Sequence, residues 1–255
     1  MLQPNDGLPG KLQTTADYKG GTPVPPQETL GRYYEHLLAA LGPQGWWPAK
    51  TQLEVILGAI LTQNTTWRNA ARGITRLRER GLLSLNRLRA VDEAELQLLI
   101  RPAGFFTQKA RTIRGFVVWL DAAHAGSLER MFAKPAERLR ADLLGLKGLG
   151  PETVDAILLY AGGKPFFVAD AYTRRILARH RLLPENSSYQ RAQTFIHHSL
   201  KREAGVYNEF HALLVEVGKR YCRRSAAECA ACPLEAFLPG VAAIQPTRNL
   251  KASRA

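Results

Sequence analysis

The sequence predicts an all-α fold. Its body consists of segments of about 8 to 15 residues, each ended by Gly, Pro or a helix-capping residue. No segment shows the alternation of apolar and polar residues that is typical of a strand, and no internal repeat indicates a solenoid. With 255 residues, of which 45% are hydrophobic, the chain is long enough to bury a sizeable core.

The two ends of the chain differ in composition from this body. Residues 1–28 are rich in Gly, Pro, Gln and Thr, with Pro23, Pro25 and Pro26 close together. This composition predicts a disordered leader. Residues 239–255 have a similar character and carry three basic residues, so we expect a basic tail.

Local patterns assign several helices of the body. The run Val55–Leu61 is apolar on every face, which predicts a buried helix. Asp92 is a suitable N-cap, with Glu95 three residues further on. Thr107 is the expected N-cap of a helix that runs through Trp119.

The chain carries an excess of positive charge. It holds 35 Lys and Arg against 22 Asp and Glu, a formal net charge of +13. Most of this excess lies in residues 30–238, which hold 30 basic and 19 acidic residues. Such a field attracts polyanions, of which nucleic acid is the commonest, although a solvated basic surface has the same composition.

Membrane insertion and export are not expected. The longest apolar runs, Val55–Leu61 and Phe116–Leu120, are far shorter than the roughly 20 residues of a membrane span. The N-terminal residues show neither the apolar core of a signal peptide nor an Arg-rich amphipathic pattern. We therefore expect a cytoplasmic protein without membrane contact.

The most informative stretch, Leu143–Thr153, joins two predicted helices. Gly148 and Gly150 permit positive φ and leave backbone N–H groups uncovered at the positive end of a helix, a combination that accepts a phosphate. Pro151 starts the second helix and Gly162–Gly163 ends it. The alternative is an ordinary helical corner that uses glycine as a stop and a hinge.

Asp170 directly follows an apolar run and directly precedes an arginine-rich helix. This position predicts a helix N-cap. A carboxylate that is fixed at the start of a helix has a defined direction and a low tendency to protonate. Capping and catalysis are therefore compatible roles for this residue.

Together these blocks resemble the endonuclease III superfamily of DNA base-excision glycosylases. Leu146–Gly150 with Thr153 is similar to the helix-hairpin-helix of that family, and Val168–Asp170 is similar to its Gly/Pro-Asp region. Leu61–Thr66 resembles the segment that brings a glutamine against DNA as the target base flips out. The similarity extends from about residue 30 to residue 234, which is most of the chain.

The resemblance implies a two-domain helix-hairpin-helix glycosylase fold with the lesion site in the cleft between the domains. Residues 29–50 and 164–238 would form one domain, and residues 51–163 a central helical barrel. Asp170 would be the catalytic residue of a monomer, associated with the nucleoid, whose affinity for DNA falls with salt. The residues expected to contact duplex DNA with a damaged base are Gln63, Asn64, Lys147, Gly148, Gly150 and Thr153.

One position separates this chain from family members that also cut the DNA strand. Those members carry a lysine two residues past the second glycine of the hairpin, where its amine attacks the sugar C1′. The residue here is Glu152, and a carboxylate cannot form an imine, while Lys147 is expected to face phosphate. We therefore expect a monofunctional glycosylase in which water attacks C1′, and Asp170 stabilises the oxocarbenium-like transition state and helps deprotonate that water.

The tryptophans suggest the base that is released. Gly45–Pro48, Trp67 and Glu152–Tyr160 resemble the 3-methyladenine glycosylase branch of the superfamily. An N-alkylated purine is cationic and already a good leaving group, so the enzyme needs mainly an electron-rich aromatic pocket around the flipped base. We expect Trp46, Trp47 and Trp67 to form this pocket, although most aromatic residues simply pack in a core.

Two other functions stay open at this stage. The first is an endonuclease III-like or mismatch glycosylase with another base specificity. The second is a helix-hairpin-helix protein that binds DNA without catalysis. Asp170 and the aromatic cluster argue against the second function, because simple binding to the DNA backbone needs neither.

The three cysteines, Cys222, Cys229 and Cys232, have the spacing C-x6-C-x2-C, which favours a metal site over disulfides in a cytosolic protein. In the resembling family this run continues to a fourth cysteine and binds a [4Fe-4S] cluster, but the fourth position here is Leu238. Two alternatives remain. Either the cluster binds through three thiolates and is labile, or the chain has lost the cluster and packing keeps the loop folded, with its basic residues still facing DNA.

Overall fold

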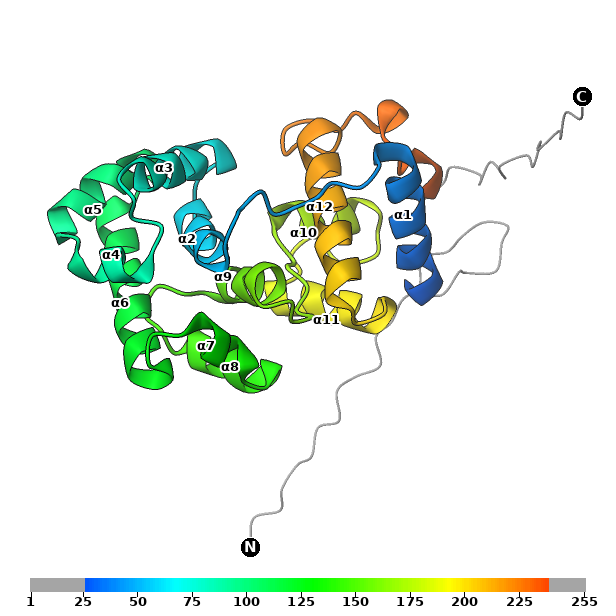
Figure 1. Ribbon diagram of the computed structural model, residues 1–255. Helices are drawn as coiled ribbons and strands as arrows, with labels where there is room; N and C mark the ends of the chain where they lie inside the picture. The colour runs from blue at the N-terminus through cyan, green and yellow to red at the C-terminus, as the bar shows by residue number, and fades with distance from the viewer. Residues whose placement is uncertain (1–25, 239–255) are drawn as a thin grey trace, which may run out of the picture.

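The computed structural model describes residues 26–238, and within this range it contains helices and turns without regular strands. The all-α prediction is confirmed (Figure 1). No helix in this range combines the length and the apolar character needed to cross a membrane. The helices are α1 (Pro26–Leu41), α2 (Gln52–Thr62), α3 (Trp67–Glu79), α4 (Leu85–Ala90), α5 (Glu93–Ile100), α6 (Phe106–His124), α7 (Leu128–Ala133), α8 (Ala136–Leu144), α9 (Pro151–Ala156), α10 (Ala171–Arg179), α11 (Tyr189–Ser199) and α12 (Ala204–Arg220).

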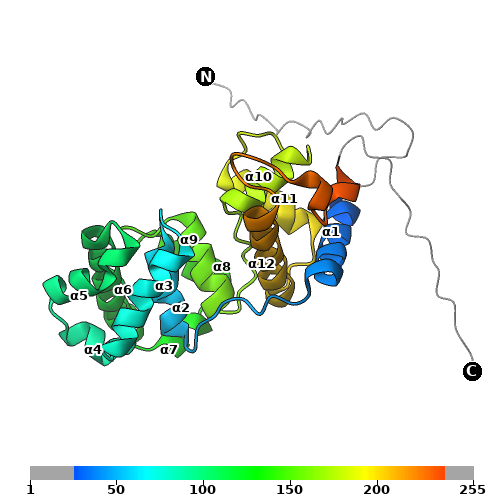
Figure 2. The same cartoon turned by 90° about the horizontal axis from the view of Figure 1, so that it is seen from above.

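The helices gather in two groups, which Figures 1 and 2 show side by side. In one group α1 packs against α11 and α12, and α10 packs against α12. The other group runs from α2 to α9. A π-helical turn, Ile157–Ala161, continues α9 and contacts both α2 and α12. Residues 42–51 and 162–170 cross between the groups, and they carry Trp46, Trp47 and Asp170. The limits of the two proposed domains stay a prediction.

The helices assigned from local patterns are confirmed with one exception. Every residue of α2 from Leu53 to Leu61 is buried, and Asp92 caps α5 by accepting a hydrogen bond from the backbone N–H of Ala94 (2.8 Å). Thr107, however, is not the cap of α6. The cap position is two residues earlier, at Phe105, which turns the chain with a left-handed φ of 46°, and the helix continues past Trp119 to His124.

The predicted leader also ends earlier than expected. Helix α1 begins at Pro26, where a proline fits the first turn because no helical acceptor is available for an N–H there. The other leader residues, 1–25, and the tail, 239–255, lie outside the described residues.

The hairpin joins α8 to α9, with Pro151 in the first turn of α9 and Gly162 at the end of its π-helical extension, as predicted. Gly148 has the expected positive φ, 92°. Gly150 does not use this freedom: its φ is −91°, since it occupies the extended N-cap position of α9. Only one of the two glycines is therefore required for its backbone conformation.

A buried carboxylate fastens the hairpin to the other group of helices. Asp155 on α9 has no exposed surface and binds Arg140 on α8 through two hydrogen bonds of 2.6 and 3.0 Å. Tyr189 and Gln193 of α11 donate to the same carboxylate at 2.8 and 2.6 Å. Gln193 also donates to the carbonyl of Phe167 (2.7 Å), which fixes the segment that leads to the predicted catalytic residue.

Candidate active site

A cavity of about 700 Å³ lies between the two groups of helices. Its walls come from the two crossing segments, from the turn between α2 and α3, and from α9 and α12. It collects most of the residues that the sequence singles out. These are Trp46, Trp47, Gln63, Asn64, Trp67, Glu152, Thr153 and Asp170.

The three predicted pocket tryptophans form one aromatic wall. Trp67 meets Trp46 and Trp47 edge to face, with ring centroids 5.2 and 5.1 Å apart. Tyr160 extends this wall at 5.1 Å from Trp47. Trp47 packs on Gly58 of α2, where a Cβ atom would lie 3.0 Å from the indole, so this glycine gives the ring its place.

Asp170 caps α10, as predicted. Its Oδ1 accepts the backbone N–H of Thr173 at 2.8 Å, and its side chain is 13% exposed towards the cavity. Burial opposes ionisation, but His211 and the Thr173 N–H outweigh it, so the pKa of Asp170 lies below its ordinary value. The residue therefore presents an anionic carboxylate with Oδ2 free for chemistry.

Two residues of the site, His211 and Tyr160, were not predicted as site residues from the sequence. His211 on α12 is 6% exposed, and its Nε2 lies 3.7 Å from Oδ2 of Asp170. Its Nδ1 is hydrogen-bonded to the hydroxyl of Tyr160. No local sequence signal reveals this pair, because residues 160 and 211 meet only through the packing of α12 on the π-helical turn.

Glu152, the residue at the position that the resemblance gives to a lysine in strand-cutting proteins, lines the same cavity. Burial, followed by the negative charge of Asp170, raises the pKa of Glu152 above its ordinary value. The side chain of Glu152 is a carboxylate and has no amine, so it cannot attack C1′ to form an imine.

Gln63 links the α2–α3 turn to the hairpin. Its side-chain amide donates to the carbonyl of Gly148 (2.9 Å) and to the hydroxyl of Thr153 (2.8 Å). Thr153 is buried and supports Gln63 from within the cavity wall, and its role as a DNA contact stays a prediction. Asn64 is exposed, has a left-handed φ of 51° and lines the cavity.

A second groove, of about 440 Å³, adjoins the hairpin and is lined by Asn64, Phe105, Lys147 and Gly148, among others. Phe105 was not predicted as a site residue from the sequence; its side chain is 63% exposed and its backbone is strained by the positive φ. Buried Lys109 holds this groove together: its Nζ donates to the carbonyls of Leu61 (2.9 Å) and Ala103 (2.8 Å).

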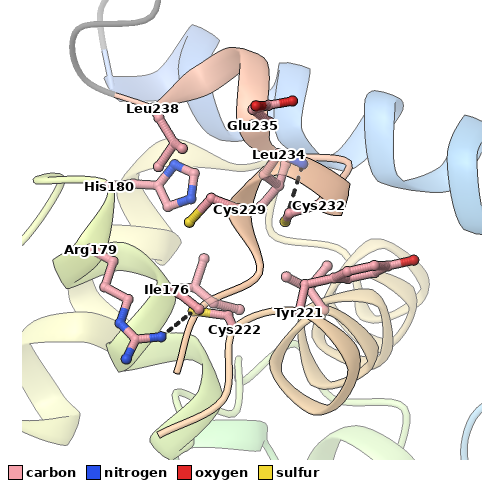
Figure 3. Close-up of a pocket in the computed structure, with 12 residues that line it drawn as sticks. Ile176, Arg179, His180, Tyr221, Cys222, Cys229, Cys232, Leu234, Glu235 and Leu238 are labelled. Atoms are coloured by element: carbon pink, nitrogen blue, oxygen red, sulfur yellow. Dashed lines mark hydrogen bonds between the residues drawn. The ribbon is translucent and has the colours of Figure 1, made fainter. Parts of the chain in front are cut away.

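The three cysteines surround one small pocket (Figure 3). None forms a disulfide. The Sγ of Cys222 accepts a hydrogen bond from Arg179 (3.1 Å), and the Sγ of Cys232 accepts one from the Leu234 N–H (3.4 Å). The fourth position of the family spacing, Leu238, lines this pocket with an aliphatic side chain. Over residues 26–238 no set of His, Cys, Asp and Glu is arranged to hold a metal ion, so these residues do not fit a four-thiolate cluster.

Protein contacts hold the cysteine loop in place. Arg175 donates to the carbonyl of Cys222 (2.8 Å), and Arg179 donates to the carbonyl of Arg223 (2.8 Å). Further along the loop, Phe237 packs on Tyr33 of α1 with ring centroids 4.8 Å apart.

Comparison with known proteins agrees with this geometry. The family model described as HhH-GPD superfamily base excision DNA repair protein matches residues 57–202. A protein of Methanocaldococcus jannaschii that bears the name of a DNA repair glycosylase is 40% identical over 82% of this chain and 96% of its own length.

Two solved structures are similar in fold. The H. pylori 3-methyladenine DNA glycosylase bound to 1,N6-ethenoadenine has a TM-score of 0.66 and 27% identity, over 77% of this chain and 98% of that chain. Endonuclease III in a non-covalent DNA complex has a TM-score of 0.71 and 19% identity, over 83% of this chain and 94% of that chain. The similarity to endonuclease III shows the fold alone.

Proposed function

Because this chain belongs to the HhH-GPD superfamily of base excision DNA repair proteins, we propose that it is a monofunctional DNA glycosylase that releases an alkylated purine such as 3-methyladenine. Its family already makes it a base-excision glycosylase, so the proposal concerns the lesion and the chemistry. One observation carries the proposal. A single cavity contains Asp170, an aromatic wall, and Glu152 in place of the lyase lysine.

The proposed reaction is hydrolysis of the N-glycosidic bond. As the base leaves, positive charge develops on the sugar, and the anionic Asp170 stabilises it in a partly enclosed site. Water then attacks C1′, and the carboxylate accepts its proton. Glu152 supplies no amine, so the product is an abasic site with an intact strand.

The aromatic wall favours a cationic base. The faces of Trp47, Trp67 and Tyr160 are electron-rich, and each face contact with a cation contributes about 0.5 to 2 kcal/mol. The ammonium group of Lys219 already lies over the ring of Trp46, 5.5 Å from its centroid. Trp47 and Trp67 are therefore the better candidates for contact with the base. The similarity to the H. pylori 3-methyladenine glycosylase supports this assignment.

We expect Trp67→Ala to lower the rate of 3-methyladenine release from methylated duplex DNA by about 2- to 30-fold, which corresponds to one lost face contact. Release of a neutral deaminated base by the same variant should change less. Trp119→Ala is the matched control, because Trp119 packs on Phe116 and His124 away from the cavity. Base release that is confined to oxidised pyrimidines or mismatched adenine would contradict the assignment.

We further propose that Phe105 inserts into the duplex beside the flipped nucleotide. The ring is exposed, stands at the groove next to Asn64 and the hairpin, and is held in a left-handed conformation that an ordinary surface residue would avoid. Apolar side chains of this kind wedge between base steps and fill the space left by an extruded base.

Phe105→Ala is expected to lower base release from duplex DNA by about 5- to 150-fold, the value of one stacking contact between a base and an aromatic ring. Release of the same lesion from single-stranded DNA should change much less, because no stack needs to be opened. Phe105→Leu should retain most of the activity, since an apolar wedge remains. Equal losses on the two substrates would show that Phe105 does not act by insertion.

For the cysteine loop we propose a cluster-free state. The contacts of Arg175 and Arg179 and the burial of Leu234 keep the loop folded without metal, and no step of the proposed reaction uses a cluster. We expect anaerobically purified protein to contain far less than the about four irons per chain of a complete cluster and to lack iron–sulfur absorbance. Serine at all three cysteine positions should leave base release unchanged. Stoichiometric iron would contradict this proposal.

A further inference from the structure

A buried histidine and tyrosine stand directly behind Asp170. His211 contacts Asp170 on one side, with its Nε2 3.7 Å from Oδ2, and the hydroxyl of Tyr160 on the other side through Nδ1. All three residues line the aromatic cavity. The imidazole therefore lies between the catalytic carboxylate and a phenol, and its protonation pattern decides what it offers to the cavity.

The hydrogen bond to Tyr160 fixes this pattern. Burial, followed by the negative charges of Asp170 and Glu209, raises the pKa of Tyr160 well above its ordinary value, so the phenol keeps its proton. Among the described residues, Nδ1 of His211 is the one hydrogen-bond partner of this hydroxyl, so we infer that the phenol donates its proton to Nδ1. Because Nδ1 accepts, the imidazole proton lies on Nε2, the nitrogen that faces Asp170.

This Nε2–H has no hydrogen-bond partner among the described residues, although it is buried. The distance of 3.7 Å to Oδ2 is too long for a direct hydrogen bond. One water molecule can bridge the two atoms at this separation, with its oxygen about 2.8 Å from each of them. Oδ1 of Asp170 is already taken by the Thr173 N–H, so Oδ2 is the oxygen available to this water.

We propose that His211 is a positioning residue that holds the attacking water against Asp170, with Tyr160 keeping the imidazole in the donating form. This role rests on the proposed hydrolytic function. The imidazole N–H donates to one lone pair of the water, and the other lone pair forms the bond to C1′. The bond from C1′ to the base breaks with its electron pair on the base, and the water proton passes to Oδ2 and then to solvent.

Substitutions at His211 separate positioning from packing. Glutamine can place an amide N–H close to the position of Nε2, whereas asparagine can place one only near Nδ1. We expect His211→Asn and His211→Ala to lower the single-turnover rate of base release by about 100-fold, and His211→Gln to recover at least about tenfold of that loss. Affinity for a lesion duplex should stay within about twofold of wild type, because the water does not bind the DNA.

Tyr160→Phe tests the tautomer. Without the phenol donor either nitrogen of His211 can carry the proton, so we expect a loss of about tenfold. The Tyr160→Phe/His211→Ala double variant should be no slower than His211→Ala, because both substitutions act on the same water-positioning interaction and their effects are not additive. His124→Ala is the matched control, because His124 is also buried with an unpartnered Nε2 but stands outside the cavity, and its variant should release base at the wild-type rate.

The outcomes distinguish this role from the proposed function. Wild-type protein that releases no base from any lesion duplex would overturn the hydrolytic function itself. Active wild type with an equally active His211→Ala variant would overturn only the role of His211. A His211→Gln variant as slow as His211→Ala, with both variants folded, would also overturn it and leave a packing role.

Discussion

Replacing Asp170 with asparagine should lower the rate of base release by about 1,000-fold, the upper end of the effect that removal of one charge-stabilising group usually has. The carboxylate is ionised in its resting state, because His211 and the Thr173 N–H hold its pKa below the ordinary value in spite of burial. Asparagine keeps the side-chain oxygen that caps α10 but not the negative charge that faces the developing oxocarbenium ion. The fold and the affinity for DNA should therefore survive.

Single-turnover release of 3-methyladenine and binding to a lesion duplex measure the two effects separately. Asp92→Asn is the matched control. Asp92 also caps a helix, α5, through hydrogen bonds from the backbone N–H groups of Ala94 (2.8 Å) and Glu95 (3.4 Å), but it lies outside the cavity. An Asp170→Asn variant that releases base at the wild-type rate would remove Asp170 from the mechanism.

The second large effect is expected at Gly148. Its φ of 92° lies in the left-handed region, and a Cβ atom there would come within 2.2 Å of the Thr112 hydroxyl. Alanine is therefore expected to shift the hairpin at a cost of about 1 to 3 kcal/mol of stability, and to displace the N–H groups that we propose to face phosphate. Loss of one hydrogen bond to a charged phosphate, about 1.5 to 3 kcal/mol, lowers DNA affinity by about 10- to 150-fold.

Gly150 provides the contrast within the same turn. Its φ is −91°, and a Cβ atom there would meet no other atom within 4 Å. Gly150→Ala should therefore match wild type in thermal stability and lie within about threefold of it in DNA affinity. Equal losses of DNA affinity in the two alanine variants would show that the backbone conformation of Gly148 is not needed for DNA binding.

The features that the sequence predicted correctly depend on short-range patterns. The apolar run of α2, the Asp92 and Asp170 caps and the start of α9 at Pro151 each depend on a few neighbouring residues. For such features local chemistry and tertiary structure agree. The aromatic wall was predictable as a set of residues by resemblance, but not its edge-to-face arrangement.

The features that could not be predicted from the sequence depend on contacts between distant residues or on backbone strain. His211 is an ordinary helical residue until α12 packs against the turn that carries Tyr160. Phe105 adopts a left-handed conformation that its residue type disfavours. Thr153 has the character of a surface contact, yet it is turned inward to Gln63, which lies 90 residues away in the chain.

Strand cleavage tests the central claim, hydrolytic base release without a lyase step, most directly. A duplex with one alkylated purine, or a methylated plasmid, is incubated with the protein and divided between neutral and alkaline work-up, and one further portion is treated with borohydride. We expect free 3-methyladenine in all portions, strand breaks only after alkali, and no protein–DNA adduct. Strand breaks at neutral pH together with a borohydride-trapped adduct would contradict the claim. In that case the loss of the adduct in a Lys219→Ala variant would identify the amine that lines the cavity as the nucleophile.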